Sequence, residues 1–173
     1  MAEPAAVTTE APTPTVAPMI APTLQDIERA RERVADVIEV TPVQQSRSIS
    51  EFLGSEVLLK CENLQRTGSF KVRGAYLRLS RLTAEERARG VVAASAGNHA
   101  QGVALAASLL GKRSVIFMPA GAPLTKVQAT RAYGAEVRLG HTLVDECIAE
   151  AQAWATEHGA VFVPPFDDRR IIA

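Results

Sequence analysis

Apolar residues recur along this chain with two different spacings. From Leu24 to Ile38 they recur every three to four residues, which is typical of an amphipathic helix, and the residue before Pro42 is pushed out of the helical region. Thr23 and Asp26 have the spacing of a capping pair at the start of this helix. The same reading predicts a short buried strand over 56–61 and a second helix over 69–82.

Beyond Gly90 the pattern becomes a regular alternation. Short apolar runs, typical of buried strands, begin at Val91, Ser114, Glu136 and Val161. Helical segments separate them, over 98–110, 124–133 and 142–158, and a glycine follows each helix, at Gly111, Gly134 and Gly159. Strand–helix alternation of this length predicts an α/β fold, in which right-handed crossovers build an open parallel sheet with helices on both faces.

The first 22 residues differ in composition from the rest of the chain. They hold half of its ten prolines and neither lysine nor arginine, so we expect a disordered Pro/Thr/Ala leader over 1–22 rather than a signal peptide. Two ordered parts are expected to follow, over 23–89 and 90–165, with a short return segment over 166–173.

Composition and charge exclude several classes of protein. The 173 residues are 47% apolar and carry 19 basic and 19 acidic side chains, so neither nucleic acid nor an anionic membrane is an expected partner. Cys61 and Cys147 lie far apart and are expected to be reduced in a cytoplasmic protein, although the sequence leaves a disulfide open. The three histidines lack the spacing of metal ligands, and no nucleotide-binding fingerprint occurs.

The stretch TGSFKVRGAY places Lys71 at the start of the second helix. A helix N-terminus disfavours a cation and burial acts in the same direction, so the pKa of this lysine should fall. A neutral lysine amine is a nucleophile for carbonyl groups and a base. Phe70 could face a planar ring, and Gly74 would admit a close neighbour. A solvated surface lysine on an ordinary amphipathic helix is the alternative interpretation.

A second polar turn, SAGNHAQG, lies between the strand at Val91 and the next helix. Ser95, Gly97, Asn98 and His99 would place side-chain donors beside the free N–H groups of a helix N-terminus, which is a suitable site for a small carboxylate. The alternative is a plain turn in which Asn98 caps the helix and His99 is a surface or core histidine.

Together, KCENLQRTGSFKVRGA, SAGNHAQG and the late PFDD resemble the serine/threonine dehydratase family of pyridoxal-phosphate enzymes, with the tryptophan-synthase-β-like fold. The resemblance extends from Thr23 to Ala173. It implies dehydration and deamination of L-threonine to 2-oxobutanoate and ammonia, and of L-serine to pyruvate. It also implies a small amino-acid substrate and a homo-oligomer when the protein is full length.

The resemblance also implies roles for single residues. Lys71 would hold pyridoxal 5'-phosphate covalently and remove the α-proton, Phe70 would pack on the pyridine ring, and Asn98 would hydrogen-bond its hydroxyl. Ser95, Gly97, Asn98 and His99 would bind the substrate carboxylate. Serine racemases of this type carry a serine where this chain has Ala96. Because a methyl group relays no proton, elimination is expected rather than racemisation.

The chain departs from the family pattern in lacking a glycine-rich phosphate loop. We therefore expect a complete small domain over 90–165 and only the first part of a large domain over 23–89, with exposed apolar faces at Leu58, Leu59 and Leu77. Two alternatives to a lyase stay open: a non-catalytic α/β fragment that needs a partner chain, and a serine racemase-like pyridoxal-phosphate enzyme.

Overall fold

The computed structural model describes residues 21–172, so residues 1–20 of the expected leader lie outside the described part. The first helix, α1 (Leu24–Val34), begins where the sequence predicts. The Thr23 hydroxyl accepts a hydrogen bond from the Asp26 N–H at 3.2 Å, and the Asp26 carboxylate accepts from the Thr23 N–H at 2.9 Å. This reciprocal pair satisfies donors that a helix start leaves free.

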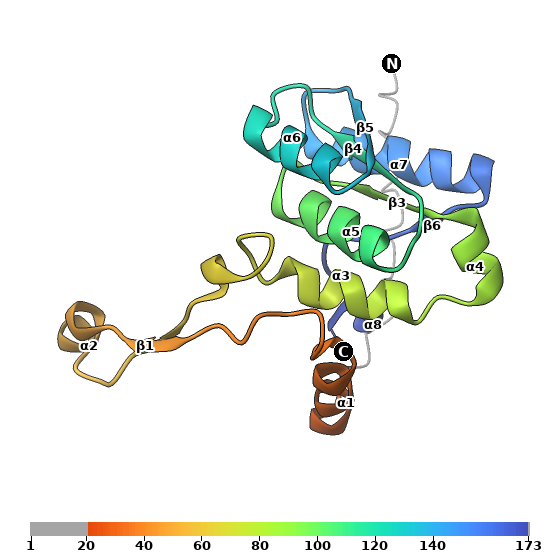
Figure 1. Ribbon diagram of the computed structural model, residues 1–173. Helices are drawn as coiled ribbons and strands as arrows, with labels where there is room; N and C mark the ends of the chain where they lie inside the picture. The colour runs from red at the N-terminus through yellow and green to blue at the C-terminus, as the bar shows by residue number, and fades with distance from the viewer. Residues whose placement is uncertain (1–20, 173) are drawn as a thin grey trace, which may run out of the picture.

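A four-stranded parallel sheet forms the centre of the molecule (Figure 1). Its strands are β3 (Val91–Ala94), β4 (Ser114–Met118), β5 (Glu136–Leu139) and β6 (Val161–Phe162), in the order β5-β4-β3-β6. The connecting helices are α5 (Asn98–Leu109), α6 (Leu124–Ala132) and α7 (Val144–His158). All four strand starts were predicted, and the helices end within two residues of expectation.

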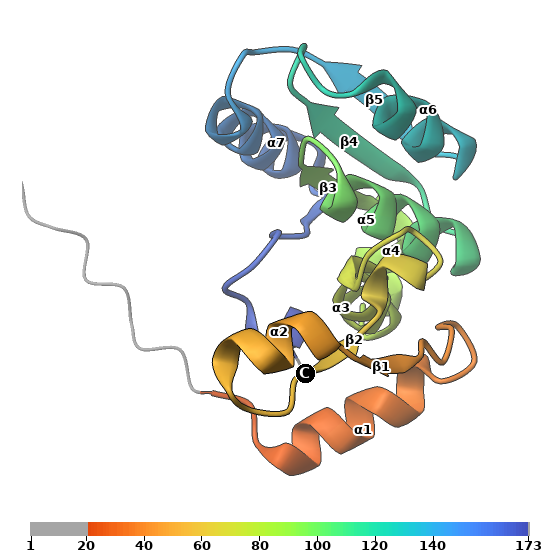
Figure 2. The same cartoon turned by 90° about the vertical axis from the view of Figure 1, so that its left-hand side faces the viewer.

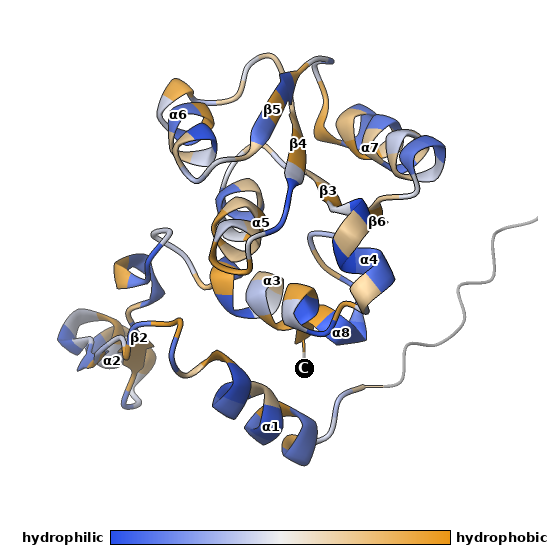
Figure 3. Cartoon of the chain, turned by 45° about the vertical axis from the view of Figure 1, so that its right-hand side comes forward, coloured by the Kyte–Doolittle hydropathy of each residue, from blue (hydrophilic) through white to orange (hydrophobic). Residues whose placement is uncertain are grey.

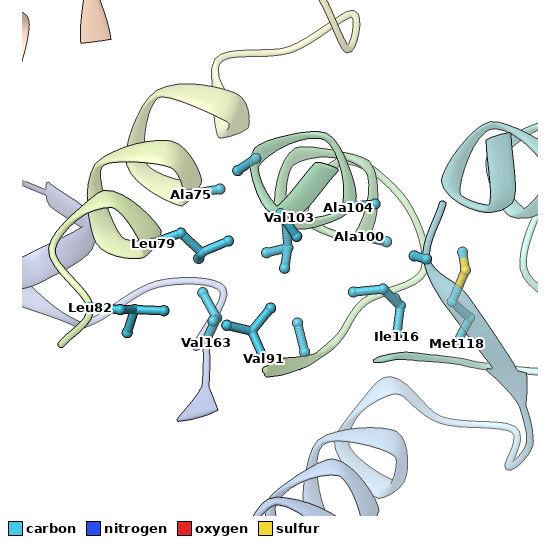
Figure 4. Packing of buried hydrophobic residues seen from close by; sticks show 14 of the residues in the cluster. Ala75, Leu79, Leu82, Val91, Ala100, Val103, Ala104, Ile116, Met118 and Val163 are labelled. Carbon is cyan, nitrogen blue, oxygen red and sulfur yellow. The ribbon is translucent and has the colours of Figure 1, made fainter. Parts of the chain in front are cut away.

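The two faces of the sheet are covered by different helices, as the strand alternation requires. Val91 and Ala93 of β3, with Ile116 and Met118 of β4, face a core shared with α5 (Figure 4). The intervening residues point the other way and pack against α7; they are Val92, Ala94, Val115 and Phe117. The prediction of an open parallel sheet with helices on both faces is confirmed.

Helix α3 (Lys71–Ser80) packs against α5 on one side and α1 on the other (Figure 2). The apolar side chains of α3 that face α5 lie in the main core, where Leu79 is 1% exposed. Leu77 points towards α1 and is 2% exposed, packed with Ala30 and Val34. The expectation that Leu77 would be exposed is therefore wrong, because α1 covers it.

A two-stranded antiparallel ribbon projects from this body (Figure 1). It consists of β1 (Val43–Gln45) and β2 (Leu58–Lys60), joined through α2 (Arg47–Leu53). The strand predicted over 56–61 exists, but it is not buried: Leu58 and Leu59 are 57% and 44% exposed. No second layer among the described residues covers the ribbon, so the predicted burial is wrong and the predicted exposure of both leucines is confirmed.

Three short elements complete the described chain: the 3-10 turn η1 (Glu62–Leu64), α4 (Ala84–Arg89) and α8 (Arg169–Ile172). Figure 3 shows the contrast between the apolar residues of β3 and β4 and the largely hydrophilic residues of α1. Within residues 21–172, no helix has the length and hydropathy needed to span a membrane.

Candidate active site

Lys71 is the first residue of α3. Gly102 of α5 has no side chain, and this lets the first turn of α3 pack closely on α5. A Cβ atom on Gly102 would lie 3.1 Å from the Lys71 carbonyl carbon and 3.2 Å from its oxygen. On the other side of α3, a Cβ on Gly74 would lie 2.5 Å from the Ile171 carbonyl oxygen. Both glycines therefore permit backbone contacts that any larger residue would disrupt, which agrees with the close approach predicted at Gly74.

The Lys71 amine is half-buried and points to the segment after β6. Its Nζ donates a hydrogen bond to the Pro165 carbonyl oxygen at 2.6 Å. Burial lowers the pKa of the Lys71 ammonium below its ordinary value. The direction agrees with the sequence argument, and desolvation of the amine is its physical cause.

A cavity of about 340 Å³ lies between this lysine and the polar turn. Lys71 and Pro165 line one side, and Val144, Asp145 and Ile148 of α7 line another. The rest of the wall comes mainly from the turn that was predicted to bind a carboxylate: Ser95, Ala96, Gly97, Asn98 and His99. The fold thus brings Lys71 to one cavity with all four predicted carboxylate-binding residues, at the carboxyl end of β3, where ligands bind in open α/β sheets.

Phe70 lines a neighbouring cavity of about 580 Å³, whose wall also includes Lys71, His99 and Phe166. Phe70 is 57% exposed, and the Lys71 Nζ lies 5.3 Å from the centroid of its ring. An aromatic face is therefore available beside the amine.

Within the polar turn, the Ser95 hydroxyl oxygen accepts a hydrogen bond from the Gly97 N–H at 3.1 Å. Gly97 is the residue that precedes α5, and no side chain caps this helix. Asn98 is therefore not a cap, which removes one interpretation left open by the sequence. Its Oδ1 accepts instead from the Lys126 Nζ of α6 at 3.0 Å. The N–H groups of the first turn of α5 have no partner within the helix, so an anion can use them.

His99 is a core histidine, 3% exposed. Its Nε2 lies 3.0 Å from the Val163 carbonyl oxygen, and because a carbonyl only accepts, Nε2 must carry the hydrogen. Burial lowers the pKa of the ring to about 4; the Val163 bond opposes this shift and the charge of Lys71 adds to it. The ring is therefore neutral near pH 7.

Sequence reasoning missed Lys126, Pro165 and Phe166 as neighbours of the site. The PPF stretch follows the last strand after one residue, Val163, and its place at the carboxyl end of β6 was the available signal. Lys126 carried no such signal. Across residues 21–172, no group of three or more histidine, cysteine, aspartate or glutamate side chains is placed to hold a metal ion.

The Lys71 amine is partly desolvated and lies in a cavity beside a polar turn at the N-terminus of α5. Such a site suits a class of protein that uses covalent amine–carbonyl chemistry. The family model described as "Pyridoxal-phosphate dependent enzyme" matches residues 34–173. The chain belongs to this family, and its cofactor is pyridoxal 5'-phosphate.

Individual relatives are similar over most of the chain. The L-threonine ammonia-lyase of Thermotoga maritima is 51% identical over 151 residues, which are 87% of this chain and 38% of the relative. A solved threonine deaminase from Solanum lycopersicum is 38% identical with a TM-score of 0.76, over 88% of this chain and 46% of that one. Maize serine racemase is 35% identical with a TM-score of 0.81, over 88% and 46%. The chain thus spans less than half the length of these relatives.

Proposed function

We propose that this chain supplies the covalent lysine and the carboxylate-binding turn of an ammonia-lyase that acts on L-threonine and L-serine. The products are 2-oxobutanoate or pyruvate, and ammonia. The observation that supports the proposal is that the Lys71 amine, its pKa lowered by burial, shares one cavity with the Asn98 turn. The name of the Thermotoga maritima relative supports the same substrate class.

The described residues fit the ring end of the cofactor. Lys71 and Asn98 line one cavity, where they offer an amine and a side-chain donor. Phe70 offers an aromatic face in the neighbouring cavity, which Lys71 also lines. Bound pyridoxal phosphate supplies an aldehyde that condenses with amines and a ring that withdraws electron density from the α-carbon. Lys71 would hold the cofactor, Phe70 would pack on its ring and Asn98 would donate to its hydroxyl.

The remaining roles concern the substrate. Ser95, Gly97, Asn98 and His99 form the carboxylate site, with the first-turn N–H groups of α5 as its main donors. Lys71 would serve as the base for the α-proton, and for this its amine must be uncharged. Burial of the amine favours the uncharged form, and the Pro165 carbonyl orients it without adding a negative charge.

Ala96 decides between elimination and racemisation in this proposal. It lines the same cavity as Lys71 and presents only a methyl group. Inversion of a stereocentre by proton transfer needs a donor on each face of the α-carbon, and a methyl group cannot serve as one. We therefore favour a lyase, although serine racemases share the fold.

Several further properties belong to the same proposal. Residues 90–165 form a small domain and residues 23–89 the first part of a larger one; the complete protein is a cytoplasmic homo-oligomer without nucleic-acid or membrane partners. The second candidate is a non-catalytic chain that associates with a partner. The exposed apolar side chains of the β1–β2 ribbon favour it, since Leu58 is 57% and Val43 58% exposed.

The test is covalent attachment of the cofactor. The protein is incubated with pyridoxal phosphate, reduced with borohydride and digested, and the modified peptide is identified by mass spectrometry. We expect modification at Lys71, its loss in Lys71→Ala, and no change in the control Lys112→Ala. Release of 2-oxobutanoate from L-threonine tests the reaction. Turnover of threonine that is undiminished in Lys71→Ala would exclude the proposed mechanism.

A further inference from the structure

Lys126 occupies an unfavourable position for a cation, in the first turn of α6. Its side chain runs alongside the polar turn: its Cγ lies 4.0 Å from where a Cβ atom of Gly97 would be, and its Nζ donates to Asn98 Oδ1 at 3.0 Å. No other side chain hydrogen-bonds the Asn98 amide among the described residues.

This contact decides which end of the Asn98 amide is free. An ammonium group has three donors and no acceptor, so the amide oxygen must face Lys126. The amide nitrogen, with its two N–H donors, is then the end left for a ligand in the cavity that Asn98 lines. Without the lysine, either end of the amide could face that cavity.

We propose that Lys126 is a positioning residue that sets Asn98 as a donor, and so makes this wall of the cavity selective for an oxygen that accepts hydrogen bonds. The proposal rests on the proposed function, in which that oxygen is the ring hydroxyl oxygen of the cofactor or a carboxylate oxygen. The charge on Lys126 also polarises the amide, which strengthens the N–H donors on its far side.

Three substitutions separate this role from simple packing of the lysine side chain. Lys126→Arg keeps a donor-only group, Lys126→Met keeps the apolar stem without a donor, and Lys126→Glu offers only acceptors and should turn the amide around. Lys112→Met is the matched control, since Lys112 lines neither cavity. Thermal unfolding checks that each variant is folded.

The first readout is the dissociation constant of pyridoxal phosphate, measured by absorbance titration. We expect Lys126→Arg and Lys112→Met to bind within about twofold of wild type, Lys126→Met to bind about fivefold more weakly, and Lys126→Glu more weakly still, by at least about tenfold. Equal affinities for the Arg, Met and Glu variants would overturn the proposal.

The second readout needs no cofactor. The side-chain amide resonances of Asn98, assigned by their loss in Asn98→Ala, should shift in Lys126→Met and return towards wild type in Lys126→Arg. Unshifted resonances in Lys126→Met would also overturn the proposal. Failure of the wild-type protein to bind pyridoxal phosphate would instead count against the proposed function, because the amide shifts do not depend on that binding.

Discussion

Gly102→Ala should move the candidate active site without unfolding the protein. The new Cβ would lie 3.1 Å from the Lys71 carbonyl carbon and 3.2 Å from the Val72 nitrogen. Carbon atoms pack best at about 3.5–4.0 Å, so the first turn of α3 must retreat by about 0.5 Å. The contacted atoms are backbone, which cannot rotate away as the end of a side chain would.

Two energies of opposite sign determine the change in stability. Alanine favours the α5 helix over glycine by about 1 kcal/mol, whereas overpacking typically costs about 1–3 kcal/mol. We expect a net loss of about 1 kcal/mol, which lowers the melting temperature by about 2–4 °C for a chain of this size. A 1 Å displacement of a reacting group can cost about 100-fold in rate, so half of that displacement predicts a loss of about tenfold.

The assay is the rate at which pyridoxal phosphate attaches to Lys71, trapped by borohydride and quantified by peptide mass spectrometry. Gly121→Ala is the control, because a Cβ at Gly121 meets nothing within 4 Å. Slow attachment in Gly102→Ala together with normal attachment in Gly121→Ala is expected. A Gly102→Ala protein with a wild-type rate of attachment would show that the close approach of α3 and α5 does not position the amine.

Three further predictions concern titration and stereochemistry. The pKa of His99 is about 4 in the folded protein and 6.5 in the unfolded chain, so the free energy of unfolding falls as the pH drops through this window. We expect a loss of about 2 kcal/mol between pH 7 and pH 5, measured by urea unfolding. His99→Gln keeps a hydrogen-bond donor but does not titrate, so it should lose less stability over the same pH range. The hydrogen bonds from Arg73 are the main cause that lowers the pKa of Glu62 to about 2. Glu62→Gln should therefore remove about 1–2 kcal/mol above pH 5 and little at pH 2, where about half of the native carboxyl is protonated and most of the stabilisation by the ion pair is already lost. An equal effect at both pH values would contradict the ion pair. Ala96→Ser should produce D-serine from L-serine, detected by chiral chromatography, while wild type and Gly121→Ser produce none. If Ala96→Ser formed no D-serine, residue 96 would not lie on the second face of the substrate α-carbon.

Local patterns predicted the parts of this fold that local interactions determine. The helix over 24–34 has its own capping pair, and the strands at Val91 and Ser114 are uniformly buried runs, so neither needs distant residues to be recognised. The β1–β2 ribbon could not be predicted in this way. Its strands have only three residues each, and its pairing joins Val43 to Lys60, which are distant in the sequence. The capping box at Thr83 and Glu86 did signal α4 and was overlooked.

The candidate active site likewise has a part that could be predicted from the sequence and a part that could not. The residue types at Lys71 and in the Asn98 turn, together with the family resemblance, were enough to predict that they lie at one site. Their partners could not be predicted, because Lys71 and Pro165 are 94 residues apart in sequence and Lys126 and Asn98 are 28 apart. Such contacts depend on how helices and strands pack, and no periodicity along the chain encodes them.

Lys71 has a carbonyl oxygen as its partner, and this matters because the proposed function requires the amine to lose its proton. A carboxylate at 2.6 Å would favour the ammonium and raise its pKa, and no described carboxylate forms an ion pair with Lys71. Pro164 and Pro165 have no N–H groups, and the Val163 N–H is already bonded to the Val92 carbonyl oxygen, so this segment offers the site acceptors alone. Its Val163 carbonyl holds His99 and its Pro165 carbonyl holds Lys71. One extended segment thus orients both His99 and Lys71 through neutral carbonyl oxygens. Because no negative charge among the described residues raises the pKa of the Lys71 amine, its burial lowers that pKa.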